Sequence, residues 1–208
     1  MHRIRASLGL VLGVALMGAT PNTAANAFLD TWAKMTSYTC DFKVHETKGS
    51  DVQDRTYHYA YLKPHFARID ITGGPGRGGG AVWSGGDTVS GHQGGFLSGI
   101  HLKVSIHDGK AVDLRGATIQ AASFQTFAEE LANAPAASTE ATVDGVATDA
   151  ITVPFTDELG ATKRVIYLSR ATHLPVRRVT YAGDTVVAQE DFSNVNTAAN
   201  LKESDFGG

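Results

Sequence analysis

Apolar and polar residues alternate along much of this chain. In residues 38–45, Tyr38, Cys40, Phe42 and Val44 alternate with polar or charged residues. A period of two is typical of a β-strand with one buried face and one face in water. Similar segments predict further strands at residues 56–62, 65–72, 81–83, 88–92, 101–107, 151–155, 162–168, 176–181 and 185–192.

Two segments show a helical period instead. The apolar residues at 28, 32 and 35 would share one face of a short helix, and so would those at 124, 127, 128 and 131. Ser123 is a suitable N-cap for the second helix, which should end before Pro135. Turns such as Asp144-Gly145 and Gly183-Asp184 separate the strands, and no β-α-β alternation is visible. We therefore expect a mainly β (α+β) fold with an antiparallel sheet.

The first 27 residues are typical of a signal peptide. Arg3 and Arg5 precede an apolar stretch at residues 8–17, and Ala25-Asn26-Ala27 fits a cleavage signal. This predicts export to a periplasm-like space and a single domain at residues 28–208. The whole chain carries 18 Lys and Arg against 21 Asp and Glu, with no basic cluster, so no nucleic-acid partner is expected. Cys40 is the only cysteine, which excludes an intrachain disulfide.

Several catalytic signatures are only partly present. Residues 74–79 fit the letters G-x-G-x-x-G, but strand and turn residues follow where a dinucleotide site needs a helix. We interpret this glycine run as a hairpin loop. His45-Glu46 has Gly49 in place of the second histidine of a zinc-protease motif, and His101 and His107 lie too far apart on one strand to share a metal. No catalytic residue, metal or cofactor is therefore assigned.

Two stretches of the sequence carry a resemblance to a known family. The first is a helix followed by a strand at residues 37–42, then Tyr61-Leu-Lys-Pro64 and Phe66-Ala-Arg-Ile69. The second is the sequence from Tyr167 to Phe206, with its Leu-Pro turn and a last strand that runs into Asn194-Val-Asn196. In this order of strands and anchors the chain resembles the outer-membrane lipoprotein carrier (LolA-like) superfamily.

The resemblance implies a strongly curved antiparallel sheet, an unclosed barrel, with helices as a lid over its concave face. Family members shield acyl chains of lipoproteins or other lipids in the periplasm. Lys63 stands where these carriers commonly have an arginine that holds the lid, so it is the candidate lid latch. Because lysine lacks the planar fork of arginine, general apolar-ligand binding is favoured over direct lipoprotein transfer.

The candidate site residues follow from the side of each strand that carries apolar residues. For the hydrophobic cavity these are Phe42, Val44, Tyr57, Tyr59, Tyr61, Ile69, Ile71, Trp83, Leu102, Val104, Ile106, Val165, Tyr167, Val179 and Tyr181. The candidate lid residues are Phe28, Trp32, Met35, Phe124, Phe127 and Leu131. Each of these side chains could instead be ordinary core.

The sequence thus predicts a soluble periplasmic carrier or chaperone, without enzymatic activity, that binds acyl chains for transport towards the outer membrane. The expected partners are a lipid or lipidated protein and a donor or acceptor protein in the inner or outer membrane, and we expect a monomer. Two alternatives remain open. One is a regulatory module of the same fold that senses lipid or protein, and the other is a hydrolase or metal protein built on the histidines.

Overall fold

The computed structural model describes residues 22–95 and 101–207. They form one antiparallel sheet of eleven strands and two α-helices, so the expected fold class is confirmed. The strands are β1 (Ser37–Lys48), β2 (Asp51–Leu62), β3 (Phe66–Gly73), β4 (Gly80–Trp83), β5 (Thr88–His92), β6 (His101–Ser105), β7 (Thr139–Val143), β8 (Val146–Pro154), β9 (Lys163–Ser169), β10 (Pro175–Ala182) and β11 (Thr185–Asn196).

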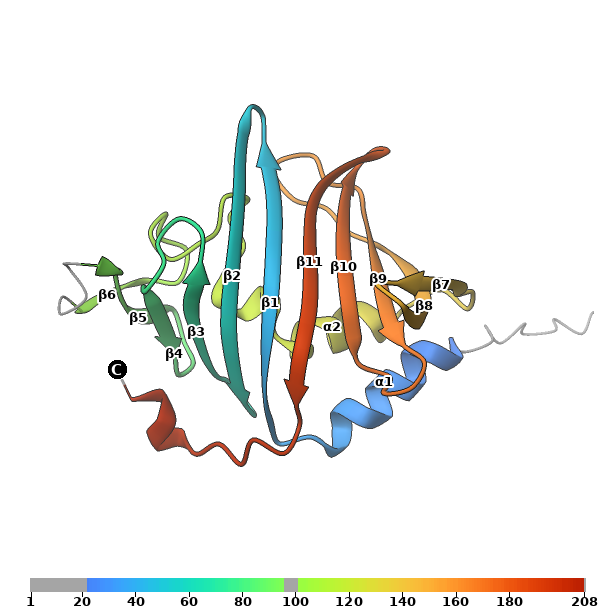
Figure 1. Ribbon diagram of the computed structural model, residues 1–208, viewed down its shortest axis with the longest axis horizontal. Coiled ribbons are helices and arrows are strands. Elements are labelled where there is room, and N and C mark those ends of the chain that lie inside the picture. Colours follow the sequence, from blue (N-terminus) through green and yellow to red (C-terminus); the bar gives the residue numbers. More distant parts are fainter. Residues whose placement is uncertain (1–21, 96–100, 208) are drawn as a thin grey trace, which may run out of the picture.

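The sheet consists of two meanders joined at their long central strands. Its order is β6-β5-β4-β3-β2-β1-β11-β10-β9-β8-β7, so the first and last strands of the chain pair in the middle (Figure 1). β6 and β7 form its two edges, and the sheet therefore does not close into a barrel. The connection from β6 to β7 contains the short 3₁₀ helix η2 (Ile119–Ala122) and helix α2 (Phe124–Leu131).

Strand β7 is an element that the sequence pattern did not predict. Only Val143 of its five residues is buried, as befits an edge strand, so there is no apolar alternation to detect. The following turn was recognised: Asp144 and Gly145 have φ angles of 49° and 84°. Positive φ at both central residues is what a tight two-residue hairpin requires.

Both helices form where the apolar spacing indicated, but the first starts earlier. Helix α1 (Thr23–Lys34) begins five residues before the predicted domain start at residue 28. The Asn22 side chain caps it by accepting from the Ala25 N–H at 3.0 Å, and the same side chain donates to the Pro135 carbonyl at 2.8 Å. The Ser123 side chain caps α2 as predicted.

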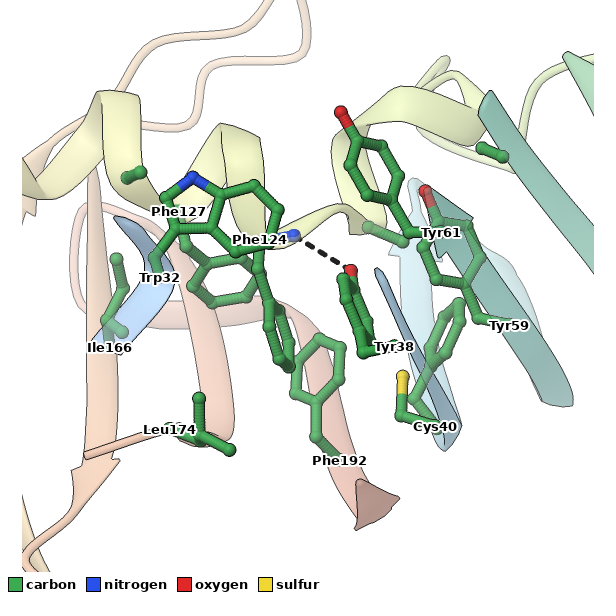
Figure 2. Packing of buried hydrophobic residues seen from close by; sticks show 14 of the residues in the cluster. Trp32, Tyr38, Cys40, Tyr59, Tyr61, Phe124, Phe127, Ile166, Leu174 and Phe192 are labelled. Carbon is green, nitrogen blue, oxygen red and sulfur yellow. Dashed lines mark hydrogen bonds between the residues drawn. The ribbon is translucent and has the colours of Figure 1, made fainter. Parts of the chain in front are cut away.

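An aromatic core joins the two helices to the sheet (Figure 2). The rings of Phe124 and Tyr38 stack with centroids 4.1 Å apart, and the Phe124 N–H donates to the Tyr38 hydroxyl at 2.9 Å. Trp32 and Phe192 both pack edge-on against Phe124. All six predicted lid residues are buried in this core. No helix in the described ranges is long and apolar enough to cross a membrane.

Candidate functional site

A cavity of about 610 Å³ lies on the concave face of the sheet next to the aromatic core. Its floor is apolar and comes from the central strands, because successive residues alternate between the two faces of each strand. Five of the predicted cavity residues line it, on β1, β2 and β3: Phe42, Val44, Tyr57, Ile69 and Ile71. We call this space the large cavity.

The chain between β6 and α2 forms the opposite wall of the large cavity. Ala111, Val112 and Ile119 face the floor from this side. We call residues 109–122 the cover segment. Tyr59 fixes it to the sheet by donating to the Ile119 carbonyl at 3.1 Å, and Arg178 does so by donating to the Ala121 carbonyl at 2.8 Å.

The glycine run supplies one end of the large cavity. It is the β3–β4 hairpin loop, as predicted: the Gly78 N–H donates to the Ile71 carbonyl at 2.8 Å, and the Ile71 N–H donates back to Gly79. A second loop packs directly onto it, since a Cβ on Gly94 would lie 2.0 Å from the Arg77 carbonyl oxygen. Only glycine allows the two backbones to approach this closely.

The rim of the large cavity carries positive charge. Arg55, Arg77 and Lys110 all lie along it, beside the glycine loop. The Arg55 guanidinium is held in place by donating to the Pro75 carbonyl at 2.9 Å. An apolar floor below a cationic rim suits a molecule with an aliphatic part.

The other predicted cavity residues on β2, β4 and β6, and Ile106 directly after β6, lie outside the large cavity. Tyr59, Tyr61 and Trp83 are buried in the core, where their rings pack against other side chains rather than bordering open space. Ile106 is also core, Val104 packs partly buried against it, and Leu102 is 42% exposed near the sheet edge.

The assignment of faces on β9 and β10 was wrong. The inward positions of β9 are Arg164, Ile166 and Leu168, which are buried. On β10, Arg178 points inward and contacts the cover segment. The predicted residues therefore lie on the opposite, convex face: Val165, Tyr167, Val179 and Tyr181. The error arose on β10 because Arg178 and Thr180 occupy the inward positions, and on β9 because apolar residues stand on both faces.

The two helices do not cover the large cavity, although their predicted apolar residues pack as expected. Phe28, Phe124 and Phe127 are fully buried against the sheet and against one another. The wall opposite the cavity floor is the cover segment instead. The helices therefore close the aromatic end of the concave face, and the cover segment forms one wall of the half-open cavity.

Lys63 contacts helix α1, as the lid-latch interpretation requires. Its ammonium donates to the Trp32 carbonyl at 2.5 Å and lies 3.8 Å from the centroid of the Trp32 ring. Cations near a helix C-terminus are stabilised by its exposed carbonyls. Partial burial lowers the pKa of Lys63. The contact joins the end of β2 to the last turn of α1.

A second cavity, of about 410 Å³, lies beside the first and is lined mostly by charged and polar residues. We call it the charged cavity. Arg178 is 1% exposed; it forms a two-pronged ion pair with Glu190, one bond measuring 2.7 Å, and its guanidinium stacks 4.5 Å above the Phe127 ring. Arg164 forms an ion pair with Glu130 on α2. Burial, together with the nearby Arg178, lowers the pKa of Arg164 to about 10.

Two carboxyl groups in the charged cavity have raised pKa values. Burial, and after it the adjacent carboxyl of Asp113, raises the pKa of Glu46 to about 9. The pKa of Asp113 is also raised, again chiefly by burial. Glu46 is therefore protonated at pH 7, which lets a carboxyl group stand on the buried face of β1 without an ionic partner. Within residues 22–95 and 101–207, no group of three or more His, Cys, Asp or Glu side chains is placed to hold a metal ion.

Solved structures of other proteins share this architecture. No protein-family model and no curated protein matches the chain. Among solved structures, a DUF1329 family protein from Desulfovibrio piger matches with a TM-score of 0.51 at 12% identity, over 91% of this chain and 98% of that one. A putative outer membrane lipoprotein-sorting protein domain from Vibrio parahaemolyticus matches with a TM-score of 0.48 at 13% identity, over 88% and 95%.

A LolA superfamily protein from Nitrosomonas europaea also matches, with a TM-score of 0.41 at 10% identity, over 88% of this chain and 97% of that one. The chain has a LolA-like fold. At these identities the likeness concerns the fold and not the activity. The shared fold accounts for the unclosed sheet.

Sequence reasoning missed the charged half of this LolA-like concave face. Glu46, Arg164 and Arg178 continue the inward positions of β1, β9 and β10, but charged residues in strands are normally interpreted as solvent-facing. A signal was available for Glu46, which follows Tyr38, Cys40, Phe42 and Val44 at the same period of two. The cover segment carried no comparable signal, since most of it is irregular chain.

Proposed function

We propose that this protein is a periplasmic carrier or chaperone that holds an acyl chain of a lipid or lipidated protein in the large cavity. The proposal rests above all on one observation: a half-open space of about 610 Å³ with an apolar floor, between the sheet and the cover segment. Soluble proteins rarely keep apolar surface of this kind open without a ligand or partner. In this role the protein shields its cargo and needs no catalytic group.

The volume suits one long chain. A methylene group occupies about the same volume as a water molecule, about 30 Å³ in the liquid, so a chain of about 16 carbons needs about 480 Å³. At about 0.8 kcal/mol per buried CH₂, such a chain offers roughly 12 kcal/mol. This is enough for capture without a specific contact, and release would then require a donor or acceptor protein or a movement of the cover segment.

A periplasmic carrier has to be exported, and the predicted leader ends close to the start of the folded chain. The predicted leader ends within α1, whose cap Asn22 and whose residue Ala25 are 4% and 2% exposed. Removal of residues 22–27 would delete the cap and part of the buried face. We therefore propose that the leader is cleaved before Asn22, so that the exported protein keeps all of α1.

Lipid extraction and a substitution that fills the cavity test the carrier function. The protein purified from a periplasmic extract should release a stoichiometric lipid, identified by mass spectrometry. Ile71→Trp places a bulky ring on the cavity floor and should weaken the binding of methyl laurate at least tenfold. Thr72→Trp is the matched control, because the next residue of β3 points to the other face of the sheet. Equal binding by both variants, with no copurified lipid, would refute the proposal.

A further inference from the structure

Three buried polar atoms of the charged cavity have no partner within the described protein. They are Glu46 Oε2, Glu130 Oε2 and Arg178 Nη1, and the side chains that carry them line the cavity. Glu46 is 4% exposed and Arg178 is 1% exposed. The nearest carboxylate oxygen to Arg178 Nη1 in an ion pair is Glu130 Oε1 at 3.7 Å, beyond hydrogen-bond distance. Buried polar groups normally have a partner, so each of these atoms needs one.

The three atoms differ in what they require. Arg178 Nη1 is a donor and calls for an acceptor, whereas Glu130 Oε2 is an acceptor and calls for a donor. Glu46, protonated because its pKa is about 9, can do either. A hydroxyl group donates and accepts through a single atom, so a molecule with two or more hydroxyls can satisfy all three.

The charge of the cavity disfavours an ionic ligand. Its three arginines are already paired: Arg115 with Asp157 at 2.6 Å, Arg164 with Glu130, and Arg178 with Glu190. The remaining charged or titratable groups lining it are Glu46, Asp113 and His107. An added anion would face the carboxylates of these pairs, and an added cation would face the guanidinium groups, so neither gains a free counter-charge.

The charged cavity is adjacent to the place proposed for an acyl chain, because the two cavities share lining residues. Asp113, Glu190 and the cover-segment residues 117, 118 and 121 line both cavities. On the sheet, Val44 of the apolar floor is paired with Glu190 of the ion-pair cluster. One molecule can thus place an apolar chain in the large cavity and a polar group a few ångströms away.

We propose that the charged cavity is a subsite for an uncharged, hydroxyl-bearing head group, such as a glycerol or sugar moiety, of the lipid whose chain occupies the large cavity. This inference rests on the proposed carrier function and deepens it by naming the class of ligand. The unpartnered atoms of Glu46, Glu130 and Arg178 recognise the hydroxyls, and the large cavity recognises the chain.

The test compares ligands with the same 12-carbon chain and different head groups, by isothermal calorimetry on the full exported protein. The ligands are 1-lauroylglycerol, dodecyl glucoside, methyl laurate and lauroyl lysophosphatidate. Two or three added hydrogen bonds should make the glycerol ester or the glucoside bind about 10- to 100-fold tighter than methyl laurate. Whichever of these two binds tighter identifies the source of the hydroxyls.

Two variants at Glu46 locate the effect. Glu46→Gln keeps an uncharged group that donates and accepts, and should retain most of the preference for the hydroxylated ligand. Glu46→Leu removes the polar atoms and should reduce the preference about fivefold, while the affinity for methyl laurate stays unchanged. An apolar residue at a buried position is compatible with folding, and circular dichroism verifies this for both variants.

The outcomes separate this inference from the carrier function. If methyl laurate fails to bind, the carrier function itself is refuted. If methyl laurate binds and the hydroxylated ligands bind no tighter, ordered water satisfies the three atoms and the head-group subsite is refuted. Tighter binding of lysophosphatidate would place the head group at the cationic rim of Arg55, Arg77 and Lys110, and would equally overturn the assignment.

Discussion

Glu46 makes the stability of this protein depend on pH in a direction that can be calculated. It is 4% exposed on the inward face of β1, and its pKa rises from an ordinary value near 4.5 to about 9. Burial is the main cause, and the carboxyl of Asp113 is the second. A carboxyl whose pKa is raised by folding destabilises the folded state once the pH rises above the pKa of the unfolded chain.

The sign follows from the two pKa values. Below pH 4.5, Glu46 is protonated in both states and has no effect on the pH dependence. Between pH 4.5 and pH 9 the folded state holds a proton that the unfolded state has released, so stability falls as pH rises, by up to about 1.4 kcal/mol per pH unit. The neighbouring Asp113 titrates together with Glu46, so the two carboxyl groups are treated as a pair. We expect the free energy of unfolding to fall by about 2–4 kcal/mol between pH 5 and pH 8.

Glu46→Gln removes this dependence, because the amide has nearly the same shape and no proton to lose. The variant should match the wild type near pH 5 and be more stable by about 2–4 kcal/mol at pH 8. Urea denaturation followed by tryptophan fluorescence, at half-unit steps from pH 5 to pH 9, measures both curves. Asp149→Asn, which removes a carboxylate paired with Arg170 on the surface, is the control for a general loss of charge. Parallel curves for wild type and Glu46→Gln would refute the reasoning.

Three further substitutions test the contacts that hold the helices and the cover segment. Tyr38→Phe leaves the first N–H of α2 without its acceptor and should lower the free energy of unfolding by about 1–3 kcal/mol in urea titrations. An unchanged midpoint would show that this hydrogen bond does not hold α2 to the sheet. Tyr59→Phe removes one of the hydrogen bonds that hold the cover segment and should speed the release of a bound fatty chain about three- to tenfold in stopped-flow exchange. Tyr38→Phe should leave this rate unchanged. Lys63→Met removes a charged hydrogen bond and a cation–π contact to Trp32. It should lower the free energy of unfolding by about 1–2 kcal/mol in the same urea titrations, while Lys63→Arg should keep most of that stability. Equal losses in both variants would show that the charge is irrelevant at this position.

The apolar half of the sheet could be predicted because its pattern is simple. On β1 every second residue from Tyr38 to Val44 is apolar and buried, so one choice of face was available. On β9 both faces carry apolar residues, Val165 and Tyr167 on one and Ile166 and Leu168 on the other. A period of two cannot choose between such faces. The long-range contact of Arg178 with the cover segment identifies the inward side of β10. Because Arg178 is paired with Ile166, the same contact identifies the inward side of β9.

The parts of the site that were not predicted depend on contacts between distant segments. The cover segment meets the sheet through Tyr59 and Arg178, which lie 60 and 57 residues from their partners Ile119 and Ala121. The close packing of the two glycine-rich loops at Gly79 and Gly94 is of the same kind. The secondary-structure propensities of neighbouring residues do not predict contacts between distant segments. The composition of the cover segment and of the two glycine-rich loops predicts only that each is a loop.

The distribution of burial decides which part of the molecule must move when a ligand enters or leaves. Helices α1 and α2 are joined to the sheet through rings that are fully buried, so displacing them would expose the aromatic core at several kcal/mol per ring. The cover segment is joined to the sheet through three side-chain hydrogen bonds, from Tyr59, from Arg178 and from its own Arg115 to the Thr47 carbonyl, each contributing about 1–2 kcal/mol. It buries no aromatic ring, only the smaller Ile119 and Ala122. The less costly route therefore opens at residues 109–122. A partner that controls loading or release would act on that segment, and the helices would keep the aromatic end of the concave face closed throughout.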